Sequence, residues 1–124
     1  MGAEATAPAR KLIDAGAIVT LATDANPGTS PIFSLPLIVG LAVRRYGLST
    51  HEALLAVTLN AAYVLELSKD LGSIEPGKKA DLVLLDSPAE HVAYRLGHNP
   101  VAATFVAGEP VYVRPDAQWR ITGR

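Results

Sequence analysis

The sequence contains no cysteine and has no strong excess of charge of either sign. The absence of cysteine excludes disulfides and thiolate metal sites, and it fits a cytoplasmic protein. The chain carries 11 basic and 12 acidic residues, a net charge of −1, and no basic patch or acidic tail. We therefore expect no nucleic-acid partner, and the sequence offers no basic amphipathic helix for a membrane surface.

Long apolar runs are also missing. The opening residues, MGAEATAPARK, hold no apolar core of the kind found in signal peptides. The longest nearly uncharged stretch runs from Ala25 to Val43, and Asn, Pro, Gly and Ser interrupt its first half. We therefore expect neither a signal peptide nor a membrane span, and a cytoplasmic location.

What the chain does have is a high apolar content for its size. Apolar residues make up 49% of 124 residues, which is enough for one small domain with a core. A chain this short has little interior in which to bury so much apolar surface. The sequence therefore predicts that the protein forms a homo-oligomer or is a piece of something larger.

The N-terminal third reads as a helix followed by a buried strand. Residues 8–15 predict a helix that begins near Pro8 and ends at Gly16. The run AIVTLAT, residues 17–23, lacks the polar alternation of a half-exposed strand, so we expect a strand covered on both faces, as in parallel α/β sheets. A turn-rich loop follows at 26–31.

Two helical regions come next. The first opens at Pro36 and ends at Gly47. Ser49 and Glu52 have the spacing of a capping box, which predicts the start of a helix over residues 50–67. Asn60 is a candidate break between two shorter helices within that run.

The last third is rich in strand-like residues. A Pro76-Gly77 turn leads into a predicted strand at 81–85, and residues 101–113 read as a hairpin around Gly108-Glu109. The change of character near residue 72 indicates a second architectural layer. The sequence leaves open whether Trp119 packs against this tail or marks an interface.

Asp24 is the most informative single residue, because it comes directly after the predicted buried strand. Side chains at that position in α/β folds face the crevice beyond the strand ends. A carboxylate there can hold a divalent metal or accept a proton from a metal-bound water. The alternative is that Asp24 caps the next turn through an Asx-type bond, and spacing alone favours this second interpretation.

A small polar cluster follows Asp24. Asn26, Gly28, Thr29 and Ser30 can offer backbone amides and hydroxyls to a ligand, but the same residues also make ordinary turns. The turn is the better interpretation of the cluster taken alone.

The histidines do not add a metal site. His51, His91 and His98 lack the spacings of paired metal ligands, so none of them is expected to bind metal.

Taken together, these segments resemble the C-terminal part of the imidazolonepropionases, a family of the amidohydrolase superfamily. The resemblance runs from about Ala7 to Val113. Its specific part is LATDANPGTSP, which looks like the sequence after the family's eighth barrel strand. The runs SLPLIVGLAVRRYGLSTHEALLAVTLNAAYVLEL, GSIEPGKKADLVLLD and YRLGHNPVAATFVAGEPVYV are similar to the helices, the exit from the barrel and the closing strands.

The resemblance implies roles for individual residues. Asp24 would ligate the metal at the end of the last barrel strand and help to take the proton from the attacking water. Asn26, Gly28 and Thr29 would line the substrate pocket. The family reaction is hydrolysis of 4-imidazolone-5-propanoate, a small-molecule substrate, to N-formimidoyl-L-glutamate in histidine degradation, with zinc or iron as the metal.

The implied fold class is α/β: a C-terminal fragment of a metal-dependent (β/α)8-barrel hydrolase, with helices and a few strands from the barrel and its β-domain. Residues 1–71 would form the end of the barrel, and residues 72–124 the C-terminal part of the small β-domain. The family's metal-binding histidines have no counterpart, and the chain supplies one of the eight strands that such a barrel needs. We therefore expect the isolated chain to be inactive.

Two other interpretations stay open. The chain could be a non-catalytic α/β module that self-associates through exposed strand edges and helix faces. It could also be a fragment of another cyclic-amide amidohydrolase.

Overall fold

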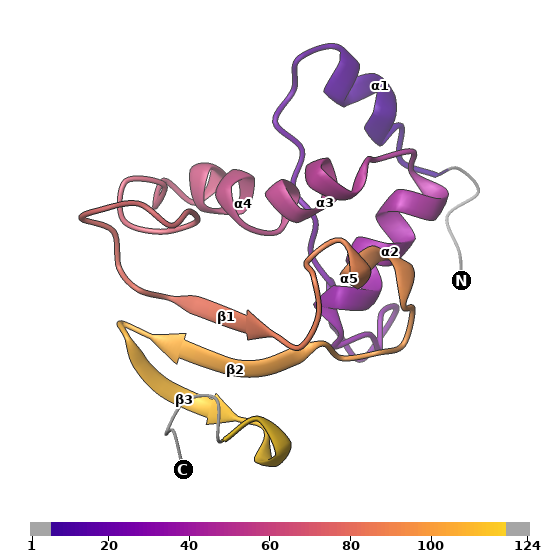
Figure 1. Cartoon of the computed structure of the whole chain (residues 1–124). Helices are drawn as coiled ribbons and strands as arrows, with labels where there is room; N and C mark the ends of the chain where they lie inside the picture. The colour runs from indigo at the N-terminus through magenta and orange to yellow at the C-terminus, as the bar shows by residue number, and fades with distance from the viewer. Residues whose placement is uncertain (1–5, 119–124) are drawn as a thin grey trace.

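The computed structural model describes residues 6–118, in which a group of helices precedes a small antiparallel sheet (Figure 1). The helices are α1 (Ala9–Asp14), α2 (Leu35–Arg45), α3 (Thr50–Ala56) and α4 (Leu59–Val64), and the strands are β1 (Leu82–Leu85), β2 (Val101–Val106) and β3 (Glu109–Val113). A short helix, α5 (His91–Tyr94), connects β1 to β2, and a 3-10 turn, η1 (Pro115–Ala117), follows β3. Trp119 lies outside the described residues.

The helix boundaries follow local capping signals, as predicted. Pro8 takes the N-cap position of α1, and Gly16 ends the turn after it with a φ of +83°. At the start of α3 the capping box is complete: the Ser49 N–H donates to Glu52 Oε2 at 2.7 Å, and the Glu52 N–H donates to Ser49 Oγ at 3.2 Å. The helices predicted at 8–15 and from Pro36 to Gly47 are therefore confirmed, and so is the start of the helix predicted over 50–67.

The helix predicted over residues 50–67 is broken into α3 and α4, but the break does not lie at Asn60. The break lies at Thr58, whose φ of −126° and ψ of −94° are not helical. The backbone N–H groups of Val57 and Thr58 turn back to carbonyls three residues earlier, and Thr58 Oγ1 donates to the Leu54 carbonyl at 2.8 Å. These bonds end α3 and allow α4 to start in a new direction.

The predicted strand at 81–85 and the hairpin are confirmed, with the hairpin turn one residue earlier than expected. The sheet has the order β1-β2-β3, and both pairs are antiparallel. The turn is made by Ala107 and Gly108, which have φ values of +51° and +86°. A two-residue turn in which both residues have a positive φ has a twist that matches the right-handed twist of the paired strands. Asp81 holds the tip in place, because its Oδ1 accepts the Ala107 N–H at 2.8 Å.

The core lies where α2, α3 and α5 meet, and small residues fill it. Val39, Ala42, Ala53 and Ala93 are all at most 2% exposed. Small side chains allow the helices to approach closely, and α5 lies directly beside α2 (Figure 1). The sequence predicts only strands after residue 72, so α5 was not predicted.

The strand predicted at residues 17–23 is not formed. Residues 17–23 form no regular secondary structure and pair with no strand among the described residues. A strand requires a neighbour that exchanges backbone hydrogen bonds with it, and the structure offers this segment only helices. The expected burial on both faces is also wrong, since Ile18 is 49% exposed.

The division at residue 72 stays a prediction. The strands all follow that residue, but α5 also follows it and packs on α2. Within residues 6–118, no helix has the length and apolar character required to cross a membrane.

Candidate functional site

The candidate site is the end of the segment at residues 17–23, where the chain turns sharply. Asp24 has a φ of +49°, in the left-handed region that non-glycine residues rarely adopt. Aspartate tolerates this conformation better than most side chains. Its backbone turns the chain out of this segment and into the loop at 26–30.

Asn26 organises that loop. Its Oδ1 accepts the backbone N–H groups of Gly28 at 2.9 Å and Thr29 at 2.7 Å, and the Thr29 hydroxyl also lies 3.2 Å away. Its Nδ2 donates to the Asp24 carbonyl at 2.6 Å. A backbone bond from the Asn26 N–H to the Ser30 carbonyl, 2.9 Å, closes the loop. The structure therefore brings all four residues selected from the sequence into one hydrogen-bonded turn.

The carboxylate of Asp24 takes no part in this network. Asp24 is exposed, and its carboxylate has no hydrogen bond or ion pair within residues 6–118. The interpretation of Asp24 as the side chain that caps the turn is wrong, because Asn26 performs that role. An exposed, unpaired carboxylate at the end of a backbone held by other residues fits a hard-oxygen metal ligand.

One carboxylate does not make a metal centre. In the part of the chain that the structure describes, no three His, Asp or Glu side chains gather closely enough to hold a metal ion.

His98 is engaged elsewhere. Its Nε2 lies 3.3 Å from the Asp86 carboxylate, which also pairs with Arg114 at 3.0 Å. The Arg114 guanidinium, and to a smaller extent His98, lowers the pKa of Asp86. This cluster joins the end of β1 to the segment after β3, far along the chain from Asp24.

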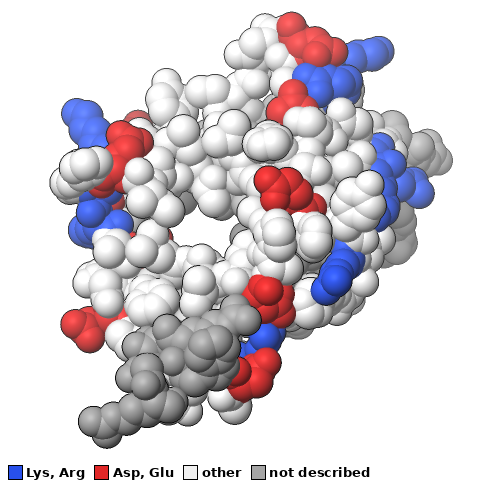
Figure 2. Space-filling view, viewed as in Figure 1, with Lys and Arg blue, Asp and Glu red and all other residues white. Residues whose placement is uncertain are grey.

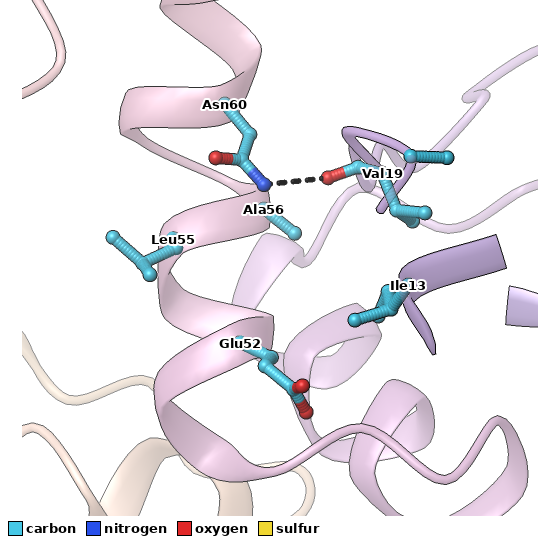
Figure 3. A pocket seen from close by; sticks show the side chains of 7 residues that line it. Ile13, Val19, Glu52, Leu55, Ala56 and Asn60 are labelled. Carbon is cyan, nitrogen blue, oxygen red and sulfur yellow. Dashed lines mark hydrogen bonds between the residues drawn. The ribbon is translucent and has the colours of Figure 1, made fainter. Parts of the chain in front are cut away.

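Two bonds from the helices hold the segment that leads to Asp24. The Leu21 N–H donates to the Ala56 carbonyl at 3.1 Å, and Asn60 Nδ2 donates to the Val19 carbonyl at 2.9 Å (Figure 3). From the sequence, Asn60 was predicted only to break a helix, and its hydrogen bond to Val19 was not predicted. The available signal was a side-chain amide within an otherwise apolar helical run.

Charge is mixed on the face of the molecule that Figure 2 shows. In Figure 2, basic and acidic side chains are scattered among each other on the visible face, and no basic patch forms there.

The described residues form packed helices and a small antiparallel sheet, which is an α/β architecture, and the exposed Asp24 carboxylate lies between α1 and α2 along the chain. The sequence profile of the amidohydrolase family matches residues 2–111, so the chain belongs to the amidohydrolase family. The predicted α/β fragment of an amidohydrolase is thereby confirmed. The superfamily is generally metal-dependent.

Among curated proteins, the chain is similar to imidazolonepropionases. It is 52% identical over 102 residues to that of Rubrobacter xylanophilus, covering 82% of this chain and 25% of the relative. It is 58% identical over 94 residues to that of Geobacillus sp. (strain WCH70), covering 75% of this chain and 22% of the relative. The chain thus spans about a quarter of the length of these relatives.

Solved structures share the fold. A protein described as a putative prolidase from Bifidobacterium longum superposes with a TM-score of 0.73 at 34% identity, covering 86% of this chain and 26% of that one. An amidohydrolase from Thermotoga maritima superposes with a TM-score of 0.69 at 30% identity, covering 85% of this chain and 25% of that one, so the arrangement of helices and sheet recurs within longer proteins.

Proposed function

We propose that the chain is the C-terminal part of an imidazolonepropionase, which hydrolyses the ring amide of 4-imidazolone-5-propanoate to N-formimidoyl-L-glutamate in histidine degradation. The observation that carries the proposal is the unpaired Asp24 carboxylate, presented beside the Asn26 turn in a chain about half identical to enzymes of that name. Its site is completed by residues that this chain does not supply.

In this proposal Asp24 is one ligand of a zinc or iron ion. When bound, such a metal would supply a lowered pKa for the attacking water and polarisation of the ring amide. Asp24 also receives the proton of the attacking water, for which an unpaired carboxylate is suited. The Asn26 turn keeps Gly28 and Thr29 together, and both are exposed and available to the substrate.

Hydrolysis by a chimeric enzyme tests this proposal. Residues 7–113 replace the matching segment of a complete imidazolonepropionase, and turnover of 4-imidazolone-5-propanoate is measured with and without Asp24→Ala. We expect the chimera to be active and Asp24→Ala to abolish turnover. An Asp24→Ala chimera that retains full activity would refute the assignment. The same chimera assayed on other cyclic amides separates the proposal from the alternative of a different cyclic amidohydrolase.

The remaining expectations belong to the same proposal. The parent enzyme works in the cytoplasm on a small-molecule substrate, with no nucleic-acid or membrane partner. The net charge of −1 and the mixed charge on the face seen in Figure 2 support the absence of a nucleic-acid partner.

Self-association is the second candidate role, and exposed apolar side chains favour it. Phe33, Ile74 and Tyr94 are 85%, 87% and 78% exposed. Exposed apolar side chains of this size are available for contact with a second copy of the chain. Light scattering on the full chain tests the idea: we expect a homo-oligomer, and a well-folded monomer would contradict it.

A further inference from the structure

The backbone leading to Asp24 pairs with no strand among the described residues, so other contacts must fix its course. Three hydrogen bonds do so, at alternate residues. They engage the Val19 carbonyl, the Leu21 N–H and the Thr23 carbonyl, which accepts from Ser30 Oγ at 2.8 Å. The first two come from the junction of α3 and α4.

The break between α3 and α4 makes these bonds available. In a continuous helix the Ala56 carbonyl would accept the backbone N–H four residues later. Because the helix breaks at Thr58, this carbonyl instead accepts the Leu21 N–H at 3.1 Å. Asn60 lies in the first turn of the new helix, and its amide group points across the gap to Val19 (Figure 3).

The helices make two hydrogen bonds to this segment. The bond from Ala56 is made by its backbone, and the bond from Asn60 is made by its side chain. Asn60 is half-buried, and its bond joins residues 41 positions apart. Val19 lies five residues before Asp24, so a shift of Val19 is transmitted along a short stretch of backbone. Displacements of about 1 Å at a reacting group can cost about 100-fold in rate.

We propose that Asn60 is a positioning residue for Asp24: by holding the Val19 carbonyl, it sets where the carboxylate lies relative to the metal. The inference rests on the proposed function, because it takes Asp24 as the metal ligand. Asn60 itself touches neither metal nor substrate.

The test uses the chimeric enzyme described above, loaded with zinc. Asn60→Leu and Asn60→Asp both remove the amide donor, one with an apolar side chain of similar size and one with a polar side chain. Metal release to an excess of a chromophoric chelator is measured together with kcat and KM. We expect metal release to be about 10 to 100 times faster, as for other residues that orient a metal ligand, and kcat to fall with little change in KM.

Two controls separate positioning from general stability. Asn99→Ala also removes one side-chain bond to the backbone, from the Val101 N–H at 3.1 Å, and should leave metal release unchanged. Asn60→Gln keeps the amide donor and should recover part of the lost kcat. A purely structural role for Asn60 would lower Tm but leave kcat and metal release unchanged well below Tm.

The outcomes distinguish this inference from the proposed function. If Asp24→Ala releases metal rapidly but both donor-free Asn60 variants match the unmodified chimera, the positioning role is wrong and the proposed function stands. If Asp24→Ala keeps its metal, the proposed function fails and the positioning role fails with it. Faster hydrogen exchange at the Leu21 N–H of Asn60→Leu in the full chain would support the role independently of metal, and unchanged exchange would count against it.

Discussion

Gly72 provides a sharp test of how the segment after α4 packs. Its φ is +91°, and a Cβ at this position would lie 2.6 Å from the Ala62 Cβ, 3.1 Å from the Leu59 Cα and 3.2 Å from the Thr58 carbonyl oxygen. Two of these atoms belong to the backbone at the break between α3 and α4. A side chain at Gly72 would therefore push on the junction from which Asn60 extends.

Gly77 is the matched control. It has the same φ of +91°, but no atom lies within 4 Å of a Cβ built there. Alanine at Gly77 meets only the cost of the left-handed backbone, about 1 kcal/mol. Alanine at Gly72 adds the cost of overpacking against fixed atoms, about 1–3 kcal/mol. We therefore expect Gly72→Ala to lose about 3 kcal/mol of unfolding free energy and Gly77→Ala about 1 kcal/mol.

Urea unfolding of the full chain, followed by far-ultraviolet circular dichroism, measures both losses. The difference between the variants reports the packing alone, because the backbone cost is shared. Equal losses would refute the close approach of residue 72 to α4.

Three further changes probe the helices. Ser49→Ala removes the N-cap of α3 and should lower the unfolding free energy by about 1 kcal/mol in urea, whereas Ser49→Thr should retain most of it. Hydrogen bonds from Arg10 lower the pKa of Glu52 to about 2, so stability should fall as the pH drops from 4.5 towards 2, and an acid titration of Glu52→Gln should lack this component. Arg44 donates to the last two carbonyls of α5, and Arg44→Met should speed amide exchange in α5 about tenfold; unchanged exchange would contradict that contact.

Signals carried by a few neighbouring residues were sufficient for most of the helix starts and ends. The Ser49-to-Glu52 spacing marks a capping box whichever elements surround it, and the glycines at 16 and 77 end or turn the chain through their own φ angles. The break after α3 was expected two residues too late, at Asn60. Thr58, which ends the helix with its own hydroxyl bond, carries no strong breaking signal in the sequence.

Contacts between distant residues could not be predicted in the same way. The apolar run at 17–23 indicates a segment suited to burial, but it does not say which neighbours are present, and here helices take the place of strands. The short helix α5 is stabilised by Arg44, 49 residues before the Ala93 carbonyl that accepts its bond. The link from Asn60 to Val19 spans 41 residues and depends on the break at Thr58.

In the candidate site, too, the sequence predicted which residues form a local group but not which contacts each side chain makes. Polarity and turn chemistry grouped Asn26, Gly28, Thr29 and Ser30, and hydrogen bonds do join these residues in one turn, whereas their roles in a site stay predictions. Spacing favoured Asp24 as the residue that caps the turn. The geometry gives that role to Asn26 and leaves the Asp24 carboxylate unpaired among the described residues.

The most direct test of the central claim is the metal content of the chimeric imidazolonepropionase that carries residues 7–113. Metal per chain is measured by elemental analysis after exhaustive dialysis, for the chimera and for its Asp24→Ala variant. We predict close to one zinc or iron ion per chain in the chimera and a loss of most of it in Asp24→Ala. Equal metal content in the two folded proteins would contradict the assignment of Asp24 as a metal ligand.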